Sequence, residues 1–243
     1  MDKLKISAVS YSNTIPFVYG IEKSGLLNNY SLELDVPSVC AQKLIENKVD
    51  IGLIPVAMIS KVKTSFIISD YCIGSIGKVN TVLLVSNKPI EKIKNIYLDF
   101  ESRTSVQLVR VLAKNYWKMD FEWQALRKDN PVDFSKLEAA VIIGDKCFAL
   151  AKKFKYVYDL SDEWRKFSSL PFVFACWVAN KKIEENIKNQ FNEAMKFGVE
   201  NIDKAIENIS SEIDLLNYLT KNISYSLDKP KRDAMDLFLK YLK

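Results

Sequence analysis

The sequence predicts an α/β protein of two lobes with a ligand-binding cleft between them. Short apolar segments alternate with helical patterns over most of the chain, which is typical of α/β units. The polar segment SNKPIEKIK (86–94) contains Pro89 and is typical of a chain that crosses between lobes. Polar clusters follow several apolar segments, at the strand ends where α/β proteins bind ligands. These observations predict lobe 1 from residues 1–87 plus 178–243 and lobe 2 from residues 88–177.

The predicted strands are short runs rich in branched apolar residues. They cover LKISAV (4–9), YSLELDV (30–36), DIGLIPV (50–56), SFIIS (65–69), TVLLVS (81–86), NIYLDF (95–100), AAVIIGD (139–145), a strand at the start of YVYDLSDEWRKF (156–167), and LPFVFACWVAN (170–180). The last is apolar at nearly every position, as expected of a strand covered on both faces.

Helical patterns separate these strands. SVCAQKLIENK (38–48) has helical spacing with Ser38 as a candidate N-cap, and a second helix is expected from about Thr104 to Tyr116. An Asp/Ser cap and a short helix are expected within YVYDLSDEWRKF. After Asn180 the pattern predicts helices and no strands, and their apolar stripes are interpreted as packing surfaces.

Composition excludes several classes of function. The chain has 35 basic and 30 acidic residues among 243, and the basic ones are dispersed, which argues against a nucleic-acid partner. No apolar run approaches the ~20 residues that a membrane span requires. The four cysteines lack CxxC spacing, so no metal is expected and we predict reduced, buried thiols. With no recognisable targeting segment, a cytoplasmic location is predicted.

The chain contains no histidine. This excludes Ser-His-Asp and Cys-His catalysis and removes the commonest general base near neutral pH. Its seven glycines form neither GxGxxG nor GxxxxGK, which argues against a nucleotide. Any chemistry must therefore use carboxylates, hydroxyls, amides, Lys, Tyr, Cys, backbone dipoles or the substrate itself.

Four polar clusters follow predicted strands and are expected to face one crevice. They are SYSNTIP with Ser10, Ser12, Asn13 and Thr14, VPSV with Ser38, SRTSV with Ser102 to Ser105, and IGDK with Gly144 and Asp145. Hydroxyls, an amide and free N–H groups at helix starts suit a small carboxylate ligand.

Each cluster also has a structural interpretation. Ser38 and Ser105 are candidate helix caps, and Asp145 is a candidate N-cap as well as the best single carboxylate. Arg103 either pairs with a ligand carboxylate or forms a salt bridge to Glu101 or another acid. The residues alone leave these alternatives open.

Six segments in this order resemble the chorismate dehydratases of the futalosine route to menaquinone, over most of residues 1–180. They are SYSNTIPFVYG, VDIGLIPVAMI, VNTVLLVSNKPI, LDFESRTSVQLVRVL, AAVIIGDKCF and DLSDEWRKFSSLPFVFACWVA. The resemblance implies a two-lobed type 2 periplasmic-binding-protein-like fold, with mixed sheets flanked by helices. It also implies a cytoplasmic enzyme that removes water from chorismate without metal or organic cofactor. A monomer or homodimer is expected.

The resemblance also assigns site residues. Asn13 matches an active-site asparagine, and Thr81 stands where the family usually has Ser. Ser102, Thr104 and Ser105 match the SRTS motif, expected to cradle a carboxylate, while Arg103 either binds substrate or braces the loop. Gly144 and Asp145 match IGD. The predicted catalytic residues are Asn13 and Asp145, and the predicted substrate-binding residues are Ser12, Thr14, Ser38, Thr81, Ser102, Arg103, Thr104, Ser105 and Gly144.

Two questions stay open from the sequence. The catalytic base is either Asp145 or a carboxylate of the substrate, with Asn13 orienting the leaving hydroxyl or the enolpyruvyl group. The alternative function is a non-enzymatic binding protein or sensor for a small carboxylate.

Overall fold

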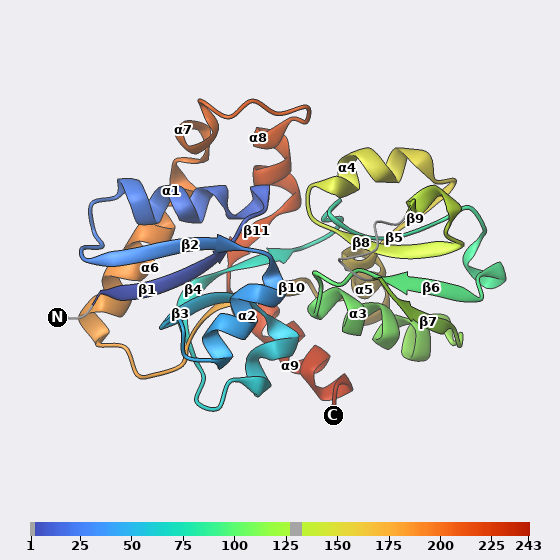
Figure 1. Ribbon diagram of the computed structural model, residues 1–243, viewed down its shortest axis with the longest axis horizontal. Helices are drawn as coiled ribbons and strands as arrows, with labels where there is room; N and C mark the ends of the chain where they lie inside the picture. Colours follow the sequence, from blue (N-terminus) through green and yellow to red (C-terminus); the bar gives the residue numbers. More distant parts are fainter. Residues whose placement is uncertain (1–2, 127–132) are drawn as a thin grey trace.

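Two β-sheets organise the molecule, one in each lobe (Figure 1). The computed structural model describes residues 3–126 and 133–243. The first sheet has the order β11-β4-β10-β3-β1-β2, and the second has the order β7-β6-β8-β5-β9. The strands of the first sheet are β1 (Leu4–Val9), β2 (Tyr30–Asp35), β3 (Ile51–Pro55), β4 (Phe66–Ser75), β10 (Phe172–Ala179) and β11 (Ser224–Ser226). Those of the second are β5 (Val82–Ser86), β6 (Asn95–Leu98), β7 (Glu122–Ala125), β8 (Ala139–Ile143) and β9 (Tyr156–Asp159).

Both sheets are mixed, as predicted. In the first, β1 runs parallel to β2 and β3, whereas β10 is antiparallel to β3 and β4. In the second, β6 is parallel to β7 and β8, whereas β5 is antiparallel to β8 and β9. The flanking helices are α1 (Ile15–Lys23), α2 (Pro37–Ile45), α3 (Thr104–Leu112), α4 (Lys146–Leu150), α5 (Leu160–Ser168), α6 (Glu185–Glu200), α7 (Ile202–Ile206), α8 (Leu215–Asn217) and α9 (Lys229–Tyr241).

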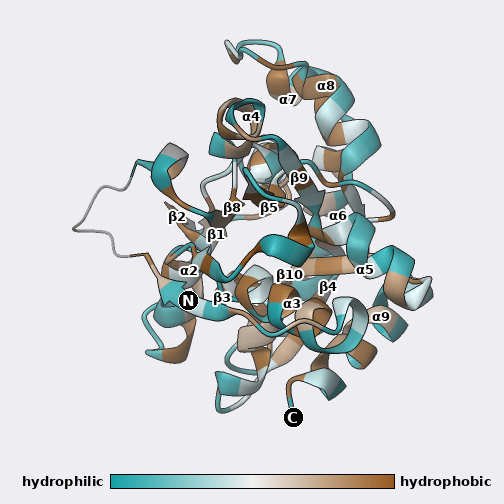
Figure 2. Cartoon of the chain, turned by 90° about the vertical axis from the view of Figure 1, so that its right-hand side faces the viewer, coloured by the Kyte–Doolittle hydropathy of each residue, from teal (hydrophilic) through white to brown (hydrophobic). Residues whose placement is uncertain are grey.

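The core lies between the sheets and their helices. Strands β3, β5, β8 and β10 are buried at every position, as expected of strands covered on both faces. The helices carry both hydrophilic and hydrophobic residues in Figure 2, because one face of each packs on the core. All four cysteines are buried and free, as predicted.

Two strands were not predicted from the sequence. Strand β7 (EWQA) is exposed at most positions, and β11 (SYS) has three residues. Strand β11 exists because it pairs with β4, which continues to Ser75, beyond the predicted end at Ser69. The prediction that the chain after Asn180 contains no strand is therefore wrong.

The predicted lobe boundaries at 87/88 and 177/178 do not coincide with the division of the strands between the two sheets. Strand β5 pairs with β8 and β9 in the second sheet, and β10 pairs with β3 and β4 in the first. The segment SNKPIEKIK forms a short 3₁₀ turn (Ile90–Lys92) between β5 and β6 within the second lobe, so it is no crossing. We propose that the chain crosses between β4 and β5 and returns between α5 and β10.

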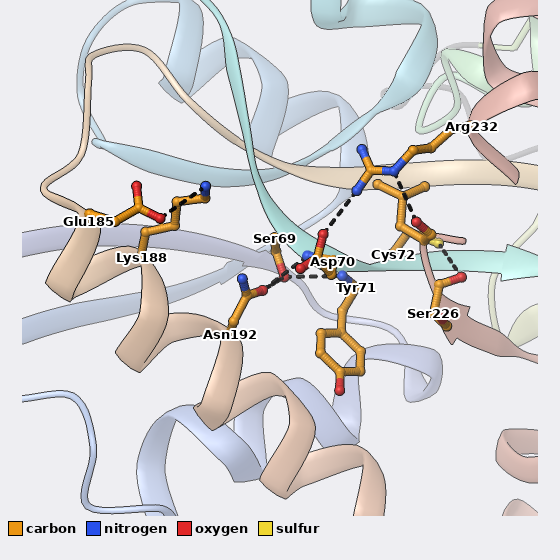
Figure 3. A network of polar contacts seen from close by, with 10 residues as sticks. Ser69, Asp70, Tyr71, Cys72, Glu185, Lys188, Asn192, Ser226 and Arg232 are labelled. Carbon is orange, nitrogen blue, oxygen red and sulfur yellow. Dashed lines mark hydrogen bonds and ion pairs between the residues drawn. The ribbon is translucent and has the colours of Figure 1, made fainter. Parts of the chain in front are cut away.

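The C-terminal tail is tied to β4 by a polar network (Figure 3). The Asn192 side chain on α6 accepts hydrogen bonds from Ser69 Oγ (2.8 Å) and from the Asp70 N–H (3.0 Å). Arg232 on α9 forms an ion pair with Asp70 at 3.0 Å. These contacts hold α6 and α9 of the tail on the first lobe.

Candidate functional site

A pocket lies between the two sheets, and its empty space, including the part open to solvent, is about 530 Å³. Of the predicted site residues, it is lined by Asn13, Thr81, Ser102, Arg103, Thr104, Ser105 and Gly144. Its other walls are Val9, Tyr11, Pro37, Pro55, Ile73, Val79, Val82, Ile143, Phe174 and Ala175. The pocket therefore combines an apolar wall with a few hydroxyl and amide groups from both lobes, a composition typical of small-molecule sites.

The structure places the remaining predicted site residues outside this pocket. Ser12, Thr14 and Asp145 line a neighbouring pocket formed with α1. Ser38 is not among the lining residues, although the adjacent Pro37 is. The binding roles of Ser12, Thr14 and Ser38 and the catalytic role of Asp145 stay predictions that the geometry does not support directly.

Asn13 lies in a 3₁₀ turn (Ser12–Thr14) between β1 and α1. Thr14 Oγ1 donates to Asn13 Oδ1 at 3.2 Å, and the Tyr225 hydroxyl donates to the Asn13 carbonyl at 3.0 Å. The Tyr218 hydroxyl lies 2.9 Å from Thr81 Oγ1, which lines the same pocket. The backbone carbonyl and the amide oxygen of Asn13 are therefore both hydrogen-bonded to residues of the first lobe.

The SRTS turn opens α3 on the opposite wall. Ser102 Oγ accepts a hydrogen bond from the Ser105 N–H at 3.1 Å, so Ser102 caps the helix and Ser105 is inside it. The prediction that Ser105 is a cap is wrong. Ser38 is not the cap of α2 either, because Pro37 occupies the first helical position after Val36.

Thr104 joins the two lobes. Its Oγ1 donates to the Phe174 carbonyl at 3.1 Å and accepts from the Ala57 N–H at 3.4 Å. Both of these partners belong to the first lobe, whereas Thr104 begins α3 of the second. This hydroxyl is therefore engaged in holding the SRTS turn against the first lobe.

Arg103 braces its own loop. Its guanidinium donates to the Phe100 carbonyl at 3.0 Å and to the Ser102 carbonyl at 3.1 Å. Glu101 pairs with Lys146, so the predicted Arg103–Glu101 salt bridge is not formed. The exposed Arg103 side chain also lines the pocket, so a contact with a ligand remains a prediction.

Gly144 is required by the close approach of Tyr11. A Cβ at this position would lie 2.8 Å from the Tyr11 ring, and the backbone has a φ of 75°, which favours glycine. The Gly144 N–H donates to the Thr81 carbonyl at 3.0 Å. Because Gly144 has no side chain, the IGD loop can pack against Tyr11 of the first lobe while its backbone bonds to Thr81.

Asp145 stands at the N-cap position of α4 but makes no capping hydrogen bond with its side chain. Instead, its exposed carboxylate accepts from the Ser12 N–H of the first lobe, with the Ser12 N lying 3.1 Å from Oδ2. Asp145 thus has the N-cap position that was one alternative for it, but its carboxylate joins the two lobes instead of capping the helix.

A charged network beside the pocket was missed by the sequence analysis. The Tyr11 hydroxyl donates to Glu101 Oε2 at 3.0 Å. Lys146 Nζ lies 2.9 Å from the same oxygen and 2.6 Å from Asp99 Oδ2. Burial disfavours the charged form of Lys146, but Asp99 and Glu101 outweigh it and raise the pKa of the ammonium. Burial and the Glu101 charge raise the pKa of Tyr11, so it stays a neutral donor.

Replacing Lys146 with Met should lower the free energy of unfolding by about 2–3 kcal/mol, because a buried carboxylate loses its cation. The Asp99 side chain is only 1% exposed. Urea unfolding measures the loss. The double variant Asp99→Asn/Lys146→Met should recover at least half of the stability that Lys146→Met loses. The control Lys229→Met, at an exposed ion pair, should change stability by less than about 0.5 kcal/mol. Equal losses in the single and double variants would contradict this interpretation.

Comparison with solved structures defines the class of fold. The chain superposes on a protein from Archaeoglobus fulgidus with a TM-score of 0.79, 16% identity and coverage of 98% of this chain and 96% of that chain. It superposes on a Candida albicans protein described as having the generic periplasmic binding protein fold, with a TM-score of 0.61, 15% identity and coverage of 100% and 95%. For the periplasmic aliphatic sulphonate binding protein SsuA from Escherichia coli the TM-score is 0.59, with 16% identity and coverage of 99% and 87%. The chain thus has the periplasmic-binding-protein fold, as predicted.

Residues 4–243 match the model of a family described as menaquinone biosynthesis, and the chain belongs to this family. Two curated relatives are named chorismate dehydratase. The Thermus thermophilus protein is 23% identical, covering 96% of this chain and 92% of its own, and the Campylobacter jejuni protein is 25% identical, covering 97% and 96%. The family resemblance inferred from the motifs is confirmed.

Over residues 3–126 and 133–243, no helix has the length and apolar character needed to cross a membrane. Within the same ranges, no group of three or more His, Cys, Asp or Glu side chains is placed to hold a metal ion.

Proposed function

We propose that this protein removes water from chorismate to give 3-[(1-carboxyvinyl)oxy]benzoate, as a step of menaquinone biosynthesis. The main support for this proposal is that Asn13 and the SRTS turn line the same cleft, one on each wall. The family match over residues 4–243 and the names of both curated relatives support the same activity.

The cleft suits a ring with carboxylates attached. The start of α3 offers backbone N–H groups and the Ser105 hydroxyl, and a helix N-terminus favours negative charge. The apolar side chains of Ile73, Val82 and Phe174 form a surface against which an unsaturated ring can pack. The SRTS turn is therefore proposed to hold a carboxylate while the ring lies toward Asn13.

The reaction needs little beyond positioning. A ring hydrogen leaves as a proton, the ring hydroxyl leaves with a proton as water, and the ring becomes aromatic, which supplies a large driving force. Asn13 would orient the leaving hydroxyl or the enolpyruvyl group. Because Asp145 lies outside the pocket and accepts from the Ser12 N–H, we favour a carboxylate of the substrate as the base.

Replacing Asp145 with Asn should leave kcat within about three-fold of the wild-type value, because the amide oxygen still accepts from the Ser12 N–H. Steady-state kinetics with chorismate measure the effect. Replacing Asp145 with Ala removes that contact and should raise KM more than it lowers kcat. A loss of more than about 100-fold in kcat for Asp145→Asn would identify Asp145 as the base.

The activity is tested directly by incubating purified protein with chorismate. The expected product is an aromatic enol ether whose mass is lower by one water, detected by mass spectrometry and ultraviolet absorbance. Chorismate that binds and is recovered unchanged would favour the alternative function, a binding protein or sensor for a small carboxylate. The cytoplasmic location and the monomeric or homodimeric state belong to the same proposal and are tested by cell fractionation and light scattering.

A further inference from the structure

We infer that Tyr11 is a positioning residue whose hydroxyl, through Glu101, holds the two walls of the cleft at the separation that bound chorismate requires. The inference rests on the proposed function, since it concerns the same cleft. Tyr11 was not among the site residues predicted from the sequence, and the names of the relatives assign it no role.

The bond between Tyr11 and Glu101 connects the segments that carry both walls. Tyr11 follows β1 of the first lobe and lies two residues before Asn13. Glu101 follows β6 of the second lobe and directly precedes Ser102, the first residue of the SRTS turn. The Tyr11 hydroxyl donates to Glu101 Oε2 at 3.0 Å, and both side chains are partly buried. A single hydrogen bond therefore spans the cleft beside the residues proposed to bind and convert the substrate.

The acceptor of this bond is held in place within the second lobe. Asp99 Oδ1 accepts from the Glu101 N–H at 3.1 Å, and Asp99 Oδ2 pairs with Lys146 at 2.6 Å. Lys146 Nζ also lies 2.9 Å from Glu101 Oε2, the oxygen that accepts from Tyr11. These contacts form a closed ring, so the position of the Glu101 carboxylate is set by its own lobe. A hydrogen bond to such a fixed, charged acceptor is stronger than one to a neutral group.

The Tyr11 ring is positioned independently of its hydroxyl. The ring packs on Gly144, where a Cβ would lie 2.8 Å from it. Tyr11 also lines the pocket together with Asn13 and the SRTS turn. Removing the hydroxyl alone therefore tests the bond across the cleft without opening a cavity in the wall of the pocket.

The separation of the walls matters because the proposed reaction uses both of them on one molecule. The SRTS turn is proposed to hold a carboxylate, while Asn13 on the opposite wall orients the leaving group. A substrate held at both ends loses contacts when the walls move apart. The bond between Tyr11 and Glu101 is remote from the reacting atoms and stabilises the bound substrate and the transition state alike. Its loss should therefore act mainly on KM.

The test is Tyr11→Phe, assayed by steady-state kinetics with chorismate. We expect KM to rise about 10-fold while kcat stays within about three-fold of the wild-type value. A loss of folded protein would lower the apparent kcat and leave KM unchanged, so this split between KM and kcat identifies positioning. The matched control is Tyr158→Phe in β9, whose hydroxyl accepts from the Ile90 N–H within the second lobe. This control should change neither constant by more than about two-fold.

A double-mutant cycle with Glu101 assigns the effect to this bond. Glu101→Ala removes the acceptor and should raise KM at least as much as Tyr11→Phe does. Adding Tyr11→Phe to Glu101→Ala should change KM by less than about two-fold, because the bond is already absent. Glu101→Gln retains an oxygen that accepts from Tyr11, so its KM should stay within about three-fold of the wild-type value.

Three results would overturn the inference. The first is a KM for Tyr11→Phe within about two-fold of the wild-type value, and the second is a further rise of about 10-fold in the double variant. The third is a KM for Glu101→Gln as high as that of Glu101→Ala, which would attribute the effect to the charge of Glu101 instead of the bond. If Tyr11→Phe does not fold, Glu101→Ala carries the test, and an unchanged KM in that variant would overturn the inference.

The wild-type protein is assayed first, which separates this inference from the proposed function. If the wild type binds chorismate without converting it, the proposed function fails, and Tyr11→Phe should still weaken binding by about 10-fold in isothermal titration calorimetry. Turnover by the wild type with an unchanged KM in Tyr11→Phe contradicts only the role of Tyr11.

Discussion

Replacing Asn13 with Ala is expected to lower kcat for chorismate dehydration by about 1,000-fold, because it removes an oriented polar group at the reacting centre. The backbone of Asn13 is held by Tyr225 and its amide oxygen by Thr14, so the amide is pre-oriented before substrate binds. Such a group acts mainly on the transition state, so KM should change much less than kcat.

The loss in Asn13→Ala must be distinguished from a loss of folded protein. Thermal unfolding should shift by only a few degrees, since the side chain is half-buried in a short turn. Asn87→Ala, at an exposed asparagine in the second lobe, is the matched control and should retain full activity. A kcat within a few-fold of wild type for Asn13→Ala would exclude Asn13 as a catalytic residue.

The parts of the site that follow strands could be predicted because they depend on local pattern. A buried apolar strand followed by polar residues places Asn13 and Gly144 at strand ends, where sheets of this class bind ligands. Thr81, directly before β5, was assigned only by the family resemblance. The SRTS turn is likewise marked by hydroxyls between β6 and an amphipathic helix. These residues line the cleft in the structure.

The parts that could not be predicted depend on contacts distant in sequence. Tyr218 is 137 residues from Thr81 and lies in a segment whose helical spacing gives no sign of a polar role. Lys146 and Glu101 have ordinary surface-helix and loop contexts, and only the packing of the lobes brings them to Tyr11. The cap assignments failed for a local reason, because Pro37 and Ser102 move the helix starts away from the hydroxyls chosen.

Replacing Gly198 with Ala is expected to destabilise the fold by about 3 kcal/mol or more, because a well-packed interior cannot accept the added methyl without backbone movement. Gly198 lies on α6 where this helix crosses α1. A Cβ there would lie 1.8 Å from the Pro16 carbonyl oxygen, and a Cβ at Gly20 on α1 would lie 2.0 Å from the Ala194 carbonyl oxygen. Both contacts are with backbone, so no side-chain rotation relieves them.

The Gly198 prediction is specific because the expected change in stability is opposite in sign to the usual effect of replacing a helical glycine with alanine. At an unconstrained helix position, Gly to Ala raises stability by up to about 1 kcal/mol through helix propensity. A decrease in the free energy of unfolding, measured with urea, therefore reports the crossing of α1 and α6 alone. The control Lys196→Ala, on the exposed face of α6, should change stability by less than about 0.5 kcal/mol. Because α1 begins directly after the turn that holds Asn13, forcing the helices apart should also lower kcat at temperatures where the variant is folded. A stabilised Gly198→Ala variant with wild-type kcat would show that α1 and α6 do not approach at these glycines.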